Sequence, residues 1–166
     1  VVGMGRIGKA IAKRLEAFNT PIVYHSRNKA EGVSYKHYPD LKTMARDVDV
    51  LVVITQGGAA TKHMVNKEVL EALGPNGIVI NVARGSVIDE QALIEALRSK
   101  TILSAGLDVF EDEPRVPQAL IDMPHVVLLP HVGSASVHCR NQMGQLVVDN
   151  LVAWSSGKPP LTPVAE

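Results

Sequence analysis

The chain has 166 residues, enough for one domain with a buried core, and its 17 basic and 17 acidic residues give a formal net charge of zero. This balance excludes the electrostatic footprint of a nucleic-acid-binding protein or of an anionic membrane surface, and no apolar run approaches the roughly 20 residues of a membrane-spanning helix. The single cysteine, Cys139, excludes an intrachain disulfide and a cysteine cluster for zinc, and it fits a reducing, cytoplasmic location.

Apolar runs of strand length alternate with segments of helical periodicity along the chain. After Val1 and Val2, strands are expected at residues 22–24, 35–38, 50–54, 78–82, 103–109 and 126–129. Helices are expected at residues 6–18, 40–46, 67–73, 89–99 and 136–154, with Asp40 and Asp89 as caps of the second and fourth, and a proline-bearing loop at 111–124. This alternation predicts an α/β fold of the Rossmann type: a doubly wound parallel sheet in the order 3-2-1-4-5-6 with an extra strand, and helices on both faces.

The first turn carries the run Gly3-Met4-Gly5-Arg6-Ile7-Gly8, a G-x-G-x-x-G spacing that leads directly into the first helix. The first glycine permits a tight turn, the second lets backbone approach a pyrophosphate, and the third lets helix and strand pack closely. The helix N-terminus adds unpaired N–H groups and the positive end of its dipole. The motif favours a dinucleotide-binding turn over a plain tight turn, with Gly3, Gly5, Arg6, Ile7 and Gly8 as cofactor-binding residues.

The position of this motif bears on the domain organisation. A buried strand needs roughly five residues, and only Val1 and Val2 precede the turn. We therefore expect a truncated first strand. Residues 1–154 are predicted to form a dinucleotide-binding domain, and residues 155–166 an extended tail that returns toward a substrate domain outside this sequence.

The second predicted strand ends in Tyr24-His25-Ser26-Arg27. An NAD-binding unit usually has an acidic residue at this point, which accepts a hydrogen bond from the ribose hydroxyl. Here Ser26 and Arg27 stand instead, and a hydroxyl with a guanidinium suits a 2′-phosphate that a carboxylate would repel. The pair predicts a preference for NADP(H), with NAD(H) possible; the alternative is a solvated loop that carries a few cations.

Three side chains of complementary chemistry follow three predicted strands: Arg84, Glu113 and His131. In an open α/β sheet, ligands bind beyond the carboxyl ends of the strands. A guanidinium can hold a carboxylate, an imidazole can move a proton, and a carboxylate can stabilise an imidazolium. Any one of these residues on a loop is more often structural, but the set of three favours a catalytic site.

Together these residues resemble the cofactor domain of the D-isomer-specific 2-hydroxyacid dehydrogenases. The resemblance rests on residues 3–8, 81–90, 106–114 and 130–134. The pair Ser26-Arg27 and the turn from Gly57 to Thr61 are most similar to the NADPH-using glyoxylate/hydroxypyruvate reductase branch.

The resemblance implies catalytic roles in the reduction of a small 2-keto acid to the D-2-hydroxy acid. Arg84 would hold the substrate carboxylate and keto oxygen, and His131 would protonate the carbonyl oxygen as NADPH delivers hydride. Glu113 would hydrogen-bond His131 and favour its imidazolium form, and Asp108 would orient the nicotinamide carboxamide. The remaining cofactor-binding positions are Ile54, Thr55, Gly57, Thr61, Val82, Ala83 and Gly133, with Arg84 and His131 beside the cofactor as well.

The sequence departs from the family pattern after the strand at residues 50–54. Many relatives carry Pro-x-Thr there, whereas this chain has Thr55-Gln56-Gly57-Gly58. The substrate domain that would form the other wall of the cleft is not in this sequence, so we expect residues 1–166 alone to turn over substrate poorly. The resemblance also implies a homodimer formed through the cofactor domain, with residues 111–124 and 136–154 as candidate surfaces.

Two other functions remain open. One is a dinucleotide-sensing, corepressor-like binding protein of the same fold, and the other a same-fold dehydrogenase of 3-phosphoglycerate, formate or phosphite. No metal site is predicted, because no histidine has other metal ligands near it in sequence. His37, His63 and His138 are expected on solvent-facing or helix surfaces, and Met143 and Trp154 in a core or an interface.

Overall fold

The computed structural model describes residues 1–164, which form two compact units. The first unit extends from Val1 to Pro130, and the second begins at His131. Each unit is described by itself.

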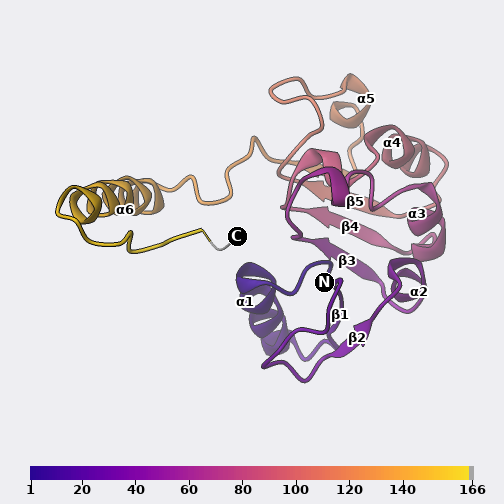
Figure 1. Cartoon of the computed structure of the whole chain (residues 1–166). Helices are drawn as coiled ribbons and strands as arrows, with labels where there is room; N and C mark the ends of the chain where they lie inside the picture. Colours follow the sequence, from indigo (N-terminus) through magenta and orange to yellow (C-terminus); the bar gives the residue numbers. More distant parts are fainter. Residues whose placement is uncertain (165–166) are drawn as a thin grey trace. The chain divides into compact units, whose positions relative to one another are not determined.

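The first unit contains a parallel sheet, and its order confirms the predicted topology (Figure 1). The strands are β1 (Val23–His25), β2 (Lys36–Tyr38), β3 (Val50–Val53), β4 (Ile78–Asn81), β5 (Ser104–Leu107) and β6 (Val126–Leu128). β1 pairs with β2, β3 to β6 pair in chain order, and Val2 bridges His25 and Val53 between the two groups. From edge to edge the order is therefore β2, β1, Val2, β3, β4, β5, β6, which is 3-2-1-4-5-6 with one added strand.

Helices cover both faces of this sheet because neighbouring strand residues point in opposite directions. Val2 and Val53 belong to the large core that includes α2 (Leu41–Arg46), α3 (Lys67–Leu73) and α4 (Glu90–Arg98). A second, smaller core lies beside α1 (Arg6–Leu15) and contains Val1, Met4, Ala12 and Tyr24. Figure 1 shows α1 on one side of the sheet and α2, α3 and α4 on the other, so the fold is doubly wound as predicted.

The predicted elements are found with small differences at their ends. Each strand lies within two residues of its predicted bounds, but the first helix is α-helical only to Leu15 and continues as a 3-10 turn, Glu16–Phe18. The predicted loop at 111–124 contains a helix, α5 (Gln118–Ile121), so that prediction was wrong there. One helical turn has too few residues to show a helical period, and α5 is held instead by Leu120, which is fully buried.

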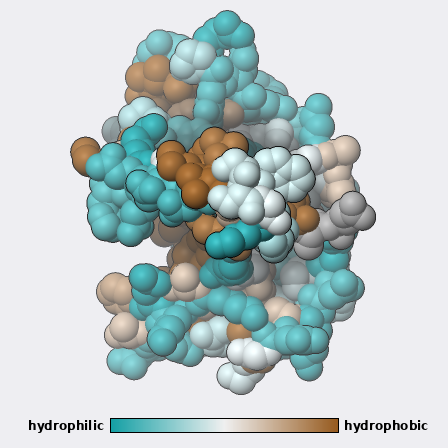
Figure 2. Space-filling model, turned by 60° about the vertical axis from the view of Figure 1, so that its left-hand side comes forward, coloured by the Kyte–Doolittle hydropathy of each residue, from teal (hydrophilic) through white to brown (hydrophobic). Residues whose placement is uncertain are grey.

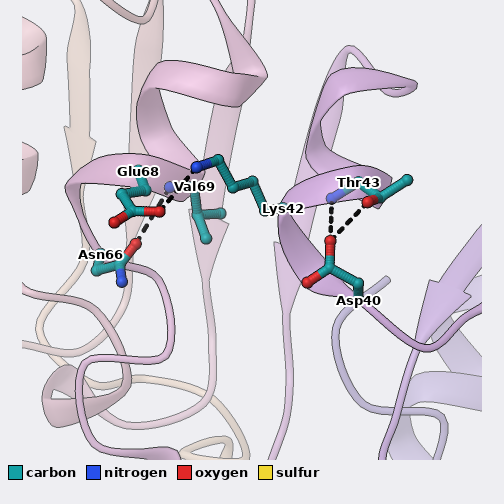
Figure 3. A network of polar contacts seen from close by, with 6 residues as sticks. All are labelled: Asp40, Lys42, Thr43, Asn66, Glu68 and Val69. Carbon is teal, nitrogen blue, oxygen red and sulfur yellow. Dashed lines mark hydrogen bonds and ion pairs between the residues drawn. The ribbon is translucent and has the colours of Figure 1, made fainter.

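Side chains cap the starts of α2 and α3 (Figure 3). The Asp40 carboxylate accepts hydrogen bonds from the backbone N–H of Thr43 at 2.7 Å and from its hydroxyl at 2.6 Å, and these bonds lower the pKa of Asp40. Asn66 accepts from the backbone N–H of Val69 at 3.1 Å. The cap predicted at Asp40 is confirmed, and the bonds from the N–H groups of Thr43 and Val69 satisfy donors at helix starts, where the helix itself leaves N–H groups unpaired.

Replacing Asn66 with alanine is expected to lower the free energy of unfolding by about 1 kcal/mol, because the N–H of Val69 loses its side-chain acceptor and keeps only the backbone carbonyl of Asn66. Urea denaturation measures the change, and Asn66→Asp, which keeps the acceptor, is the matched control. The neighbouring pair Lys42–Glu68 (2.7 Å) is exposed, so Lys42→Ala should leave the midpoint almost unchanged. A midpoint that Lys42→Ala lowers more than Asn66→Ala would contradict this ranking.

The second unit consists of a loop, one long helix and a tail. Helix α6 (Val137–Ser155) is capped by Ser136, whose hydroxyl accepts from the N–H of Cys139 at 3.2 Å. The tail is tied to α6 by Asn150 and Thr162, which exchange hydrogen bonds of 3.1 and 3.3 Å. Among residues 1–164, no helix is both long enough and apolar enough to cross a membrane.

Much of the apolar surface of α6 is exposed within its own unit. Met143 is 50% exposed and Trp154 is 70% exposed. Of the two predicted locations, a core or an interface, the core is therefore wrong within this unit. Trp154, Leu151 and Pro160 line a groove of about 400 Å³ between the helix and the tail. Figure 2 shows apolar residues gathered on the surface turned toward the viewer.

Candidate functional site

The glycine turn has the geometry that its motif requires. Gly3 has φ +98°, and a Cβ on it would lie 2.9 Å from the Cα of Thr55. A Cβ on Gly8 would lie 2.0 Å from the carbonyl oxygen of Gly3, whereas a Cβ on Gly5 would have no heavy atom of residues 1–164 within 4 Å apart from Gly5 and its two chain neighbours. Gly3 and Gly8 therefore allow α1 to start against the sheet, and Gly5 faces open space.

The start of α1 suits an anion. Within the described chain, no side chain caps this helix, and its first turn contains no acidic residue. Arg6 and Ile7, the first two helical residues, are both exposed. Backbone N–H groups at such a helix start, with the positive end of the helix dipole, are a binding site for phosphate groups.

The loop after β1 presents a cation. Arg27 is exposed and Ser26 is partly buried. The hydroxyl of Ser26 donates a hydrogen bond to the carbonyl oxygen of Asn28 at 2.6 Å. In this conformation Ser26 shapes the loop, and the guanidinium of Arg27 supplies the charge that faces solvent.

The loop after β3 is closed on itself and lies against Arg84. The Thr61 hydroxyl donates to the carbonyl oxygen of Gln56 at 2.7 Å. A Cβ on Gly57 would lie 2.8 Å from the Cγ of Arg84, so the absence of a side chain lets the stem of Arg84 pack against this turn. Ile54, at the start of the loop, packs on the smaller core beside α1. The segment that departs from the family pattern thus accommodates the predicted substrate-binding arginine.

The loop after β4 is held by Asn81, a residue that the sequence analysis did not single out. Asn81 is 1% exposed; its side-chain oxygen accepts from the N–H of Ala83 and its amide donates to the carbonyl of Arg84, both at 3.1 Å. The N–H of Val82 donates to the carbonyl of Val53 at 3.1 Å, which keeps the loop against β3. A polar residue at the end of an apolar strand was the signal in the sequence. Asn81 sets the backbone from which the exposed side chain of Arg84 extends.

The loops that carry Arg84 and Glu113 touch each other. A Cβ on Gly85 would lie 1.9 Å from the carbonyl carbon and oxygen of Phe110, so these two backbones are in direct contact. The carboxylate of Glu113 accepts from the N–H of Phe110 at 3.0 Å. Asp108, 6% exposed, precedes this turn, and its N–H donates to the carbonyl of Asn81 at 3.0 Å. The structure therefore brings the ends of β4 and β5 together, as the parallel sheet predicted.

His63, which follows β3 along the chain, contacts the loop that also carries Glu113. His63 Nε2 lies 2.8 Å from the carboxylate of Glu111, and the N–H of Glu111 donates to the carboxylate of Glu90 at 3.1 Å. Burial raises the pKa of Glu90. The side chain of His63 is 36% exposed, in agreement with the predicted solvent-facing position, but its contact with Glu111 was not predicted. No local pattern shows a contact between residues 48 positions apart.

His131 and Gly133 belong to the second unit and follow β6 along the chain. β6 keeps its register with β5 up to Leu129, whose N–H donates to the carbonyl of Leu107 at 2.8 Å. His131 is exposed and has φ +53°, in the left-handed region that residues other than glycine rarely adopt. Such backbone conformations are concentrated at functional sites.

Comparison with known proteins adds to this geometry. The family model of the D-isomer specific 2-hydroxyacid dehydrogenase, NAD binding domain, matches residues 1–133. Glyoxylate/hydroxypyruvate reductase A of Arabidopsis thaliana is 51% identical over 164 residues, which are 99% of this chain and 52% of that protein. Hydroxyphenylpyruvate reductase of Plectranthus scutellarioides is 49% identical over 164 residues, with the same shares of 99% and 52%.

A solved structure is similar over the same range. It is the NADPH-dependent glyoxylate/hydroxypyruvate reductase of Sinorhizobium meliloti in complex with NADP and malonate, with 57% identity and a TM-score of 0.96 over 99% of this chain and 53% of that one. The chain thus spans about half the length of the relatives it matches. Given the family match over most of its length, the chain belongs to the D-isomer specific 2-hydroxyacid dehydrogenases and contains their NAD-binding domain.

Proposed function

We propose that the protein reduces a small 2-keto acid of the glyoxylate/hydroxypyruvate type to the D-2-hydroxy acid with NADPH. The observation that carries the proposal is the backbone contact of Gly85 with Phe110, which joins the loops of Arg84 and Glu113 at the carboxyl edge of the sheet. The same edge holds the glycine turn. Two relatives named for glyoxylate and hydroxypyruvate reduction, one of them with bound NADP, support the substrate class and the cofactor.

The residues present fit a dinucleotide. Gly5 faces open space at an uncapped helix start, where a pyrophosphate would accept from the N–H groups of Arg6 and Ile7. Arg27, with Ser26, would hold a 2′-phosphate, and Asp108 the nicotinamide carboxamide. The walls of the cofactor cleft would be formed by Gly3, Gly8, Ile54, Thr55, Gly57, Thr61, Val82, Ala83 and Gly133.

The proposed catalytic residues have different tasks in the reaction. The guanidinium of Arg84 binds the substrate carboxylate through paired, charge-assisted hydrogen bonds and polarises the keto oxygen. When bound, NADPH would supply the hydride for the carbonyl carbon. His131, as imidazolium, donates a proton to the carbonyl oxygen, which becomes the hydroxyl of the product. Glu113 would accept a hydrogen bond from the imidazole and stabilise its positive charge.

The proposal is tested by steady-state kinetics of the full-length protein with NADPH and either glyoxylate or hydroxypyruvate. Turnover of either acid, followed at the absorbance of NADPH, is the expected result. Cofactor binding without turnover would favour the corepressor-like sensor instead. Turnover of 3-phosphoglycerate, formate or phosphite, with none of the 2-keto acids, would favour the other dehydrogenases of this fold.

The cofactor preference is tested by Arg27→Asp. We expect the NADPH/NADH ratio of kcat/KM to fall about ten- to hundredfold, because one charge-assisted contact with the 2′-phosphate is lost. Lys29→Asp is the matched control, since Lys29 is an exposed cation of the same loop. An unchanged ratio for Arg27→Asp, or an equal fall for Lys29→Asp, would contradict the assignment of the phosphate contact to Arg27.

We also propose a cytoplasmic homodimer that forms through the cofactor domain. Exposed apolar side chains support such a surface: Ile121 in the segment 111–124 is 53% exposed, and Val147 and Leu151 on α6 are 61% and 62% exposed. Analytical ultracentrifugation of the full-length protein, before and after Leu151→Lys, tests the dimer. The domain boundary at residue 154 stays a prediction.

A further inference from the structure

The loop that carries Arg27 is held at both of its ends by side chains of the sheet. His37 Nε2 lies 2.9 Å from the carbonyl oxygen of Ser26, and the Tyr24 hydroxyl accepts from the N–H of Ala30 at 2.9 Å. Because a carbonyl oxygen only accepts hydrogen bonds, Nε2 of His37 must carry the hydrogen. Residues 26–30 therefore form a short loop that is fixed at its first carbonyl and at its last N–H.

The two anchors form one packed unit. Tyr24 on β1 and His37 on β2 are direct partners in the parallel register, and their ring centres lie 5.0 Å apart. Tyr24 is completely buried, whereas His37 is partly buried at the sheet edge. The prediction that His37 lies on a solvent-facing or helix surface was wrong, since its ring contacts Tyr24 and its Nε2–H contacts the loop.

The strand that carries His37 is itself fixed in place. The Tyr38 hydroxyl donates to the carboxylate of Asp47 and accepts from the ammonium of Lys36, both at 2.6 Å. On the neighbouring strand, His25 Nδ1 donates to the carbonyl of Tyr38 at 2.9 Å. β2 is an edge strand with few neighbours, and these bonds give His37 a defined position from which to hold the loop.

The bond from His37 acts on the peptide unit that leads into Arg27. The Ser26 carbonyl lies in the plane of the Ser26–Arg27 peptide, so holding it fixes the orientation of the peptide unit that ends at the Cα of Arg27. The hydroxyl of Ser26 supports the same turn through its bond to the Asn28 carbonyl. Arg27 itself is exposed.

We propose that His37 is a specificity-determining positioning residue: it holds the Ser26 carbonyl so that Arg27 is preorganised for a 2′-phosphate. The inference rests on the NADP(H) preference in the proposed function. A side chain held in its binding orientation loses less conformational freedom on binding, which increases affinity without a new contact. NADH has no 2′-phosphate, so its affinity does not depend on this arrangement.

The test is the dissociation constants of NADPH and NADH, measured by titration calorimetry with the full-length protein. His37→Phe keeps a ring against Tyr24 but removes the donor, and NADPH affinity should fall about three- to tenfold with NADH affinity unchanged. His37→Gln keeps an N–H at nearly the same reach and should restore most of the preference. His125→Phe is the matched control, because this exposed histidine precedes β6 at the opposite edge of the sheet from Ser26.

The outcomes separate this inference from the proposed function. A wild-type protein without a preference for NADPH would overturn both the cofactor assignment and the inference. A wild-type preference that His37→Phe leaves intact would overturn the inference alone. Equal losses of NADPH and NADH affinity would also overturn it, because they indicate a general structural role. If His37→Phe does not fold, Tyr24→Phe, which removes the acceptor for the Ala30 N–H, must reduce the NADPH preference for the inference to stand.

Discussion

Replacing His131 with glutamine is expected to lower kcat of the full-length protein with glyoxylate and NADPH by about 10²–10⁴-fold. In the proposed mechanism His131 is the proton donor to the carbonyl oxygen, and loss of a positioned general acid has an effect of this size. The dissociation constant of NADPH should change far less than kcat, because the phosphate contacts proposed for the glycine turn and the loop of Arg27 do not involve His131. Steady-state and binding measurements on the same preparation separate the two quantities.

The control for this variant is His138→Gln. His138 is an exposed histidine on the first turn of α6, in the same unit as His131, and it has no proposed catalytic role. The His138→Gln variant should have a kcat within a small factor of the wild-type value. A His131→Gln protein with kcat near that of the wild type would remove His131 from the mechanism, and an equal fall for both variants would indicate damage to the unit instead.

Gly8→Ala is expected to have the second large effect, on both stability and cofactor binding. The new Cβ would lie 2.0 Å from the carbonyl oxygen of Gly3 and 3.0 Å from its carbonyl carbon, and backbone atoms cannot move aside as a flexible side chain can. Such overpacking lowers the free energy of unfolding by about 1–3 kcal/mol. Because relief of the clash must shift α1 or the turn, NADPH affinity should fall as well.

Gly5→Ala provides the matched comparison in the same motif. Apart from Gly5 and its two chain neighbours, no heavy atom of the described chain lies within 4 Å of the new Cβ, so Gly5→Ala should lose much less unfolding free energy than Gly8→Ala. It should still weaken NADPH binding, since the open space beside Gly5 is where the pyrophosphate would approach. Urea denaturation and NADPH titration of the two variants give the ranking. A Gly8→Ala protein that unfolds at the wild-type midpoint would contradict it.

Local features of the sequence were enough to predict most of the fold. Helix caps such as Asp40 and Asp89 were predicted because a cap bonds only to residues two or three positions further along. The sheet order followed from the alternation of strands and helices, because parallel strands need crossover helices. The site loops were predicted at one edge for the same reason, since all strands of a parallel sheet end on that edge.

Contacts between distant residues could not be predicted in this way. The bond between His63 and Glu111 joins two loops, and in isolation each of these residues is typical of a solvent-exposed surface. The short helix α5 depends on the burial of Leu120, not on a pattern of its own. Asn81 was overlooked because an asparagine at the end of a strand does not by itself indicate which backbone groups it will bind.

By itself, the sequence determined the fold class, the strand order, the glycine turn and the chemical types of side chain available at the site. These depend on backbone geometry and on the periodicity of apolar residues, which are local. Only the tertiary structure decided which groups hold those side chains: Gly57 and Asn81 around Arg84, Gly85 against Phe110, and His37 on the Ser26 carbonyl. The physical reason is distance. A hydrogen bond or a close backbone contact forms only when its atoms lie within a few ångströms of each other, and a sequence pattern does not specify the distance between residues from different strands.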